Sequence, residues 1–313
     1  MLGFVLKRLA LAVPTLLAVV TVVFFVIRVV PGDPAIAMLG DSATESALTA
    51  LRERMGLNEP LLIQYLNFIA GLVQGDLGLS IRTGQPVLDQ ILRVLPYTLD
   101  LTIASVLIGV VFGIPAGLLA AVRRNRWADY ITRMVSLLGL SFPVFFLAIL
   151  LIMLFSIQFS WFPVISEGDL SDPIDRLHHL FLPALAGSLG VAAFVTRATR
   201  SSVLETLGED FVRTARAKGL PGRVVLLRHA FRNALIPVVT VIGLYLGLVI
   251  GNSVLIEIVF NRPGLGKLIV ESLTQRDYAM LQGLIITYSF FIVLANLITD
   301  LTYGLMDPRV KHQ

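Results

Sequence analysis

The densest cluster of charge in this 313-residue chain lies between Arg197 and Arg232, where eight Lys or Arg accompany three Asp or Glu. Guanidinium groups such as those of Arg213 and Arg216 can form paired hydrogen bonds with carboxylates on another protein. Long apolar stretches flank this cluster on both sides. A charged, helix-forming segment between two apolar ones predicts an element outside the membrane that a partner protein contacts.

Turn-forming residues divide this charged segment into two helices. Asp210 supplies negative charge at the start of a first helix of about ten residues, roughly 15 Å long. Gly219, followed by Pro221, predicts the end of that helix, because glycine adopts positive φ at little cost. The second helix is expected to lead through Pro237 into the next apolar stretch.

Six stretches without Asp, Glu, Lys or Arg, each 17 to 26 residues long, make up much of the remaining chain. They are Leu9–Ile27, Leu101–Val122, Met134–Phe159, Leu180–Thr196, Ala234–Ile256 and Tyr278–Thr299. The core of a bilayer needs about 20 helical residues. The fold class that we expect is therefore an all-α integral membrane protein with six transmembrane helices.

The placement of Lys and Arg predicts which side of the membrane each loop faces. Sixteen of the 25 fall on the side of the termini and of the charged segment, which the positive-inside rule assigns to the cytoplasm. Both termini are therefore expected to be cytoplasmic. The first apolar stretch, Leu9–Ile27, exceeds the roughly 7–15 residues of a signal-peptide core, so we expect it to remain as a span. We attribute the pI near 9.6 to this asymmetry and not to nucleic-acid binding.

The spans and loops suggest three parts. Residues 1–30 form an N-terminal transmembrane helix, residues 31–97 an extracytoplasmic helical segment, and residues 98–313 a five-helix core. The core contains the charged cytoplasmic loop at residues 197–233.

Helix signals within the extracytoplasmic segment predict three short helices. Ser42 and Glu45 make a capping box for the first, which ends at Gly56. A second helix starts at Pro60, and Val87–Val94 forms a third. The segment is either a structural cap or a docking surface for an external protein.

Motifs for catalysis or metal binding are absent from the sequence. The GLGK run at Gly264–Lys267 lacks the P-loop pattern, because Asn261 and Leu268 stand where Gly and Ser or Thr are required. The chain contains no cysteine, which excludes thiolate metal sites and cysteine nucleophiles. His178 and His179 point to different faces of a helix. We therefore expect no enzymatic activity, no cofactor and no metal in this chain.

Polar residues inside spans are candidates for lining a translocation pathway, because burying them in a bilayer is costly. The candidates are Asn252 and Ser253 in the fifth span and Asn296 and Asp300 in the sixth. The two asparagines could instead hydrogen-bond between helices, and Asp300 could pair with a nearby arginine.

Two rows of glycines at four-residue intervals favour close helix packing. They are Gly109, Gly113 and Gly117 in one span and Gly243, Gly247 and Gly251 in another. An interface with a second membrane subunit, contact with lipid and contacts within the chain are all compatible with this pattern.

Separated motifs together resemble one family over nearly the full length. FVRTARAKG, followed by HAFRNALIP, resembles the EAA loop of binding-protein-dependent ABC importer permeases. Ala215 and Gly219 keep the second alanine and the glycine of that loop, whereas Arg213 and Thr214 replace its Glu and first Ala. The opening VPGDPA and the motifs LPYTLDLTIAS, FNRPGLGKL, RDY and DPR resemble the first permease subunit of dipeptide, oligopeptide, glutathione and nickel importers.

This resemblance implies a type I ABC importer permease fold and a non-catalytic role. In such importers the loop helix, called the coupling helix, sits in a groove on an ATPase subunit, and closure of the ATPases around ATP rocks the transmembrane helices. The residues implied at that contact are Arg213, Thr214, Ala215, Arg216 and Gly219.

Implied partners are a homologous second permease, two ATPase subunits that hold ATP and Mg, and an extracytoplasmic substrate-binding protein. The implied location is the cytoplasmic (inner) membrane of a bacterium or archaeon.

Di- or oligopeptides are the cargo that the resemblance favours, with glutathione or nickel as alternatives for the same machine. A secondary transporter is the alternative from a different class. It would require charged residues for ion coupling, and Asp300 is the only carboxylate deep within the spans apart from the boundary residues Asp100 and Glu257.

Overall fold

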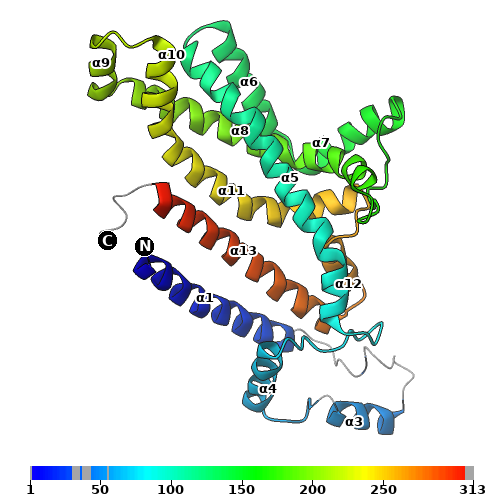
Figure 1. Ribbon diagram of the computed structural model, residues 1–313. Coiled ribbons are helices and arrows are strands. Elements are labelled where there is room, and N and C mark those ends of the chain that lie inside the picture. Colours follow the sequence, from blue (N-terminus) through cyan, green and yellow to red (C-terminus); the bar gives the residue numbers. More distant parts are fainter. Residues whose placement is uncertain (1, 30–35, 37–43, 55, 307–313) are drawn as a thin grey trace.

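The computed structural model describes residues 2–29, 36, 44–54 and 56–306, and this part of the chain is almost entirely helical (Figure 1). Within the described residues, β-structure is limited to one isolated bridge between Leu79 and Pro86. Three features of the sequence lie outside the described residues: the cap at Ser42, the VPGDPA motif at residues 30–35 and the DPR motif at residues 307–309.

Five helices of the described chain are long and apolar enough to cross a bilayer. They are α1 (Leu2–Val29), α5 (Val87–Val122), α8 (Pro173–Leu207), α11 (Arg232–Val259) and α13 (Tyr278–Met306). A bent pair completes the set: α6 (Trp127–Ser141) is followed by α7 (Val144–Leu151) and the π-helical η1 (Ile152–Gln158). Counting that pair as one span gives six, and the predicted all-α membrane fold is confirmed.

The third span is sharply bent where the sequence predicts one uninterrupted stretch. Its two halves meet at an angle of 103° between Ser141 and Val144. Phe142 is extended, with φ −93° and ψ 136°, and Pro143 caps α7. Proline lacks a backbone N–H and disfavours helical conformation in the preceding residue, so the helix ends there.

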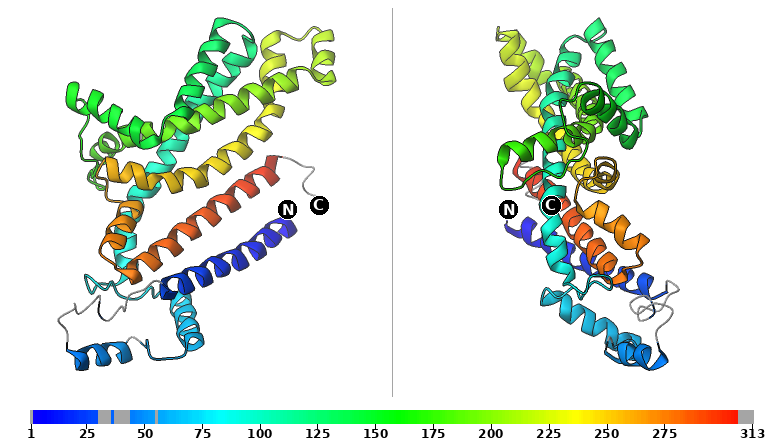
Figure 2. Two further views of the ribbon diagram at one scale, coloured as in Figure 1. Left: turned by 180° about the vertical axis from the view of Figure 1, so that it is seen from behind. Right: turned by 90° about the vertical axis from the view of Figure 1, so that its right-hand side faces the viewer.

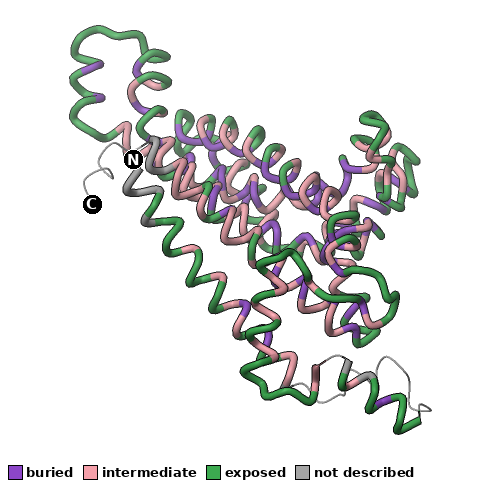
Figure 3. The backbone as a smooth tube through the Cα atoms, turned by 60° about the horizontal axis from the view of Figure 1, so that its bottom comes forward, coloured by how far each residue is buried: buried purple, intermediate pink, exposed green. Residues whose placement is uncertain are grey.

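Four long helices lie side by side in the order α8, α11, α13 and α1, and α5 crosses them at an angle (Figures 1 and 2). Buried positions concentrate where α5, α8 and α11 meet, whereas α1 is exposed along most of its length (Figure 3). In the most apolar window of α8, 56% of residues are buried, against 17% in α1. The core of the bundle is therefore around α8, and α1 is a peripheral helix packed on α13.

Glycines allow α5 and α8 to approach closely. A Cβ atom at Gly109 would lie 2.6 Å from Val191, and one at Gly113 would lie 2.8 Å from Val195. This glycine row therefore serves a contact within the chain. The second row is mixed, because Gly243 packs on α13 whereas Gly251 has no neighbour within 4 Å.

The expected separate helix at Val87–Val94 is instead the start of α5, which continues through Pro96 to Val122. Val87 and Ile91 are buried in a cluster with residues of α12 (Leu265–Thr274) and α13. This packing holds the first turns of α5 in line with the rest. The helix therefore crosses the boundary that we expected at residue 97.

The other two outer helices form as predicted. They are α3 (Glu45–Arg54), followed by Gly56 at φ +64°, and α4 (Leu61–Val73), which begins directly after Pro60. The α4 helix packs on the outer end of α1, where the hydroxyl groups of Tyr65 and Thr21 lie 2.7 Å apart.

A single carboxylate fastens the loop before α5 to the start of α13. Asp277 is almost fully buried and accepts hydrogen bonds from the Ser80 hydroxyl and the Ile81 backbone N–H. It also accepts one from the Met280 backbone N–H, in the first turn of α13. The RDY motif therefore links the outer segment to the last span through the hydrogen bonds of Asp277.

The α5–α8 contact predicts how a single methyl group affects stability. Gly113→Ala should lower the free energy of unfolding by about 1–3 kcal/mol, because the added carbon overpacks a fixed interface. Gly251→Ala is the matched control, because its Cβ meets no atom within 4 Å. Thermal unfolding in detergent compares the two, and equal midpoints would contradict the close approach.

Candidate functional site

The charged loop folds as a short helix held outside the spans. The helix α9 (Asp210–Ala217) begins after Glu209, whose backbone is extended, and ends at Lys218. Gly219 has φ +75°, and its N–H donates to the Arg216 carbonyl at 2.9 Å. The predicted helix and glycine turn are confirmed, and the helix is eight residues long.

Two faces of α9 have different surroundings. Val212 and Ala215 are buried in a cluster with Val225 and Ala230 of the segment that follows. The close approach that the small side chain of Ala215 permits is therefore to the loop's own second helix. Ala215 does not lie on the exposed face of α9.

The exposed face of α9 is basic. It carries Arg213, Thr214 and Arg216, and Lys218 and Gly219 follow directly after the helix; all five residues are exposed. Arg213 pairs with Asp210 at 3.4 Å, but both side chains are largely in solvent, at 73% and 94% exposure. Such pairs contribute about 0–1 kcal/mol, so this guanidinium can exchange its partner at little cost.

The return from α9 to the membrane is one continuous helix. It starts with α10 (Gly222–Val224), passes through the π-helical η2 (Val225–Phe231) and becomes α11 without a break. The uninterrupted stretch is 38 residues, from Gly222 to Val259, and includes Pro237. The η2 segment also packs on α9, so α9 contacts the start of the helix that becomes the span.

A buried ion pair fixes α6 to α8 on the side of the bundle that leads to α9. Asp129 is fully buried and accepts two hydrogen bonds from Arg200, at 2.6 and 2.9 Å. Its other contacts are the Asn125 backbone N–H at 2.9 Å and the Arg133 guanidinium at 3.4 Å. Asp129 was not singled out in the sequence analysis.

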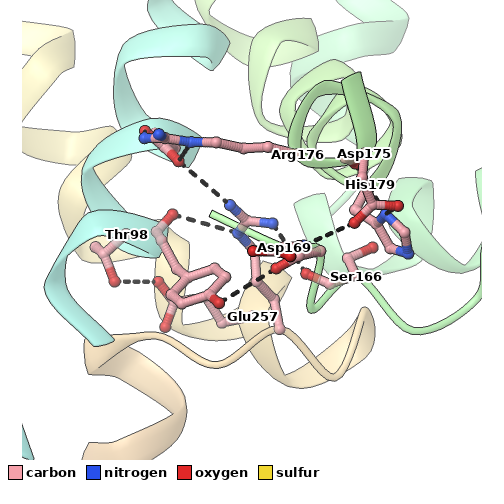
Figure 4. Close-up of polar contacts among 11 residues, drawn as sticks. Thr98, Ser166, Asp169, Asp175, Arg176, His179 and Glu257 are labelled. Carbon is pink, nitrogen blue, oxygen red and sulfur yellow. Dashed lines mark hydrogen bonds and ion pairs between the residues drawn. The ribbon is translucent and has the colours of Figure 1, made fainter. Parts of the chain in front are cut away.

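A second polar cluster lies at the opposite end of the bundle, around the FNRPGLGKL motif (Figure 4). Glu257 is fully buried and accepts from the Thr98 hydroxyl at 2.7 Å and from the Gly266 N–H at 2.7 Å. A carboxylate of α11 thereby caps the start of α12 and holds it against α5.

An arginine of the same motif joins this cluster to α8. Arg262 is 1% exposed and donates to the carbonyls of Tyr97 and Ser166. Its other nitrogen lies 3.9 Å from Asp100, which forms a two-pronged ion pair with Arg176 (Figure 4). Burial lowers the pKa of Arg262, and Asp100 opposes that effect. Sequence analysis placed Asp100 and Glu257 only at span boundaries.

The four expected pathway residues do not share one cavity. Asn252 lines a cavity of about 410 Å³ beside the bend of the third span. Asn296 and Asp300 line a smaller one of about 150 Å³, where Asp300 pairs with Arg8 at 3.0 Å. Ser253 is fully buried and lies 3.2 Å from the Tyr288 hydroxyl.

A membrane subunit that is moved by a partner protein needs spans that line a route across the membrane and an exposed element that the partner can bind. The described residues contain apolar spans with two cavities along them and a short exposed helix, α9, outside the bundle. The fold and the loop define a transport permease.

The chain belongs to the family described as binding-protein-dependent transport system inner membrane component, which residues 113–312 match. Residues 1–102 match the N-terminal membrane component of the same systems. The chain is therefore a multi-pass permease subunit of an ABC importer, as the motifs indicate, and the secondary-transporter alternative is set aside.

Named relatives match over their full length. The chain is 42% identical over 313 residues to the glutathione transport system permease protein GsiC of Escherichia coli K12, with 100% of both chains covered. It is 41% identical, at the same coverage, to GsiC of Shigella flexneri serotype 5b. A solved structure titled for inward facing conformations of the MetNI methionine ABC transporter matches with a TM-score of 0.57. That match covers 70% of this chain and 96% of the other at 19% identity, and it shows a shared fold.

Proposed function

We propose that this permease carries short peptides and that glutathione is among them. The supporting observation is the 42% identity over the full length to permeases named for glutathione transport. Glutathione is itself a tripeptide, so this proposal joins the peptide cargo favoured by the motifs with one of its alternatives. Nickel remains the competing cargo for the same machine.

The exposed face of α9 is our proposed contact with an ATPase subunit. Arg213, Thr214, Arg216 and Gly219 are accessible there, whereas Ala215 supports the helix from behind. Exposed arginines such as Arg213, whose pairing within the loop is weak, can form charge-assisted hydrogen bonds with carboxylates across an interface.

The complete transporter then comprises this chain, a homologous second permease, two ATPase subunits and an extracytoplasmic binding protein. ATP and Mg bind to the ATPase subunits, and this chain contributes no cofactor and no catalytic residue. The start of α1, the end of α13 and α9 lie at one end of the bundle (Figures 1 and 2). We assign that end to the cytoplasm, because most Lys and Arg lie there.

Uptake by the reconstituted transporter tests the cargo. The chain and its partner subunits are placed in vesicles with ATP inside, and labelled glutathione, a labelled dipeptide and radioactive nickel are supplied outside with the binding protein. We expect ATP-dependent accumulation of the peptides. Accumulation of nickel alone would overturn the peptide assignment.

Replacing Gly219 should impair the coupling of transport to ATP hydrolysis. Gly219→Val should reduce transport per ATP hydrolysed, because a β-branched residue at φ +75° costs about 1–3 kcal/mol and displaces the end of α9. Membrane insertion should be unaffected, because the residue is exposed.

Gly222→Val is the control for this variant. Gly222 is also exposed, and a Cβ atom there would meet no atom within 4 Å, but its φ is not positive. Uptake and ATP hydrolysis are measured together in vesicles. Normal coupling in Gly219→Val would count against the role of α9.

A further inference from the structure

The larger cavity lies at the bend of the third span, between α8 and α11, and has a volume of about 410 Å³. This volume is within the roughly 300–1,000 Å³ of small-molecule sites. The 103° bend turns α7 away from the line of α6 and thereby opens the space. The cavity is thus a consequence of Pro143 and not of loose packing.

One face of α11 forms a wall of this cavity. Tyr245, Leu248, Val249 and Asn252 follow one another at the spacing of a single helix face and all line the space. Among the lining residues, all of which the structure describes, the Tyr245 hydroxyl and the Asn252 amide are the polar side-chain groups. The remaining lining is aliphatic, aromatic or glycine, and no charged side chain contributes.

Gly190 keeps part of the cavity wall free of side chains. A Cβ atom there would meet no atom within 4 Å, so packing does not require a glycine at this position. A glycine inside a helix costs about 0.5–1 kcal/mol relative to alanine. Gly187, one turn earlier, differs, because its Cβ would lie 2.5 Å from the Ser105 hydroxyl. The absence of a side chain at Gly190 therefore leaves space in the cavity and does not serve a contact between helices.

The chemistry of this lining selects among the cargoes. An asparagine amide offers a donor and an acceptor, which match the N–H and C=O of a peptide bond, and a tyrosine hydroxyl adds one more group of either kind. A bare divalent cation needs several oxygen, nitrogen or sulfur ligands, and this lining offers too few. The faces of Phe145 and Phe194 suit apolar parts of a peptide.

We propose that this cavity is a transit site for short peptides, in which Asn252 and Tyr245 hydrogen-bond the peptide backbone. The proposal rests on the peptide cargo proposed above and adds the residues that recognise it. The charged ends of the peptide stay in water outside the cavity, because an uncharged apolar wall would not compensate their desolvation. Binding is therefore weak, and any charged side chain of the peptide, like its charged ends, stays in water.

Filling the cavity from Gly190 tests the proposal. In the reconstituted transporter, Gly190→Leu should reduce peptide uptake by about tenfold or more, the equivalent of at least 1.4 kcal/mol. Gly190→Ala should reduce it less, because a methyl group occupies less of the space. Gly251→Leu is the control, since Gly251 has the same free surroundings but lies outside the lining. Subunit assembly is checked by co-purification.

Cysteine labelling gives a second readout that does not depend on transport rate. The chain has no cysteine of its own, so Asn252→Cys introduces a unique thiol. A water-soluble maleimide should label this variant, and excess dipeptide should slow the labelling, while nickel should not. The neighbouring Gly251→Cys should show no such protection.

The outcomes separate this proposal from the proposed function. Two results in a peptide-accumulating wild-type background would overturn the transit site and leave the cargo assignment standing. In one, Gly190→Leu accumulates peptides as well as the wild type. In the other, Gly190→Leu and Gly251→Leu lose uptake equally. If peptide does not slow the labelling of Asn252→Cys in a complex that transports peptides, the transit site is likewise overturned and the cargo assignment stands. If the wild-type transporter takes up no peptide, both proposals fall.

Discussion

The contact of Val212 and Ala215 with Val225 and Ala230 joins the charged loop to the helix that enters the transmembrane bundle. It is a small apolar cluster, but it places α9 against a helix that continues through η2 into α11. In the coupling that we propose, a force on the exposed arginines of α9 would pass through this contact to the continuous helix and so to the membrane.

The same continuous helix also reaches the larger cavity and the polar cluster around Glu257. Its middle carries Tyr245 and Asn252 along the larger cavity, and its far end carries Glu257, which holds α12 against α5. One continuous helix therefore contacts the proposed ATPase-binding helix α9, the proposed transit site and the polar cluster around Glu257. In the mechanism that we propose, a tilt of α11 would alter all three together.

Two ionic contacts tie α8 to its neighbours α5 and α6. Asp129 ties α6 to α8 through Arg200, and Asp100 ties α5 to α8 through Arg176. Asp129 is fully buried, and removing Arg200 would leave its charge uncompensated at a cost of about 3–5 kcal/mol. Arg176 is 38% exposed, so its pair with Asp100 contributes less. Together with the glycine contact of α5 and α8, these pairs fasten α5 and α6 to α8.

Local signals allowed much of this structure to be predicted from sequence. The length of the apolar stretches predicted the spans. Gly219 and Pro60 predicted where helices end and begin, because glycine and proline act on the backbone within a few residues. The bend at Pro143 and the continuity of α5 through Pro96 could not be predicted, since the same residue type breaks one helix and not the other. Packing against α12 and α13 makes the difference. Asp129 and Arg262 were missed because their partners are distant in sequence, and the cavity arises only from the bend.

A distance measurement tests most directly whether α9 and α11 move as one body. Spin labels are placed on Arg216→Cys in α9 and Leu244→Cys in α11, both exposed, in the otherwise cysteine-free chain. A second pair joins Arg216→Cys to Phe290→Cys in α13, where the side chain is also exposed. Between the nucleotide-free and ATP-bound complexes, the first distance should stay constant and the second should change. A change in the first distance with a constant second one would contradict transmission through the continuous helix.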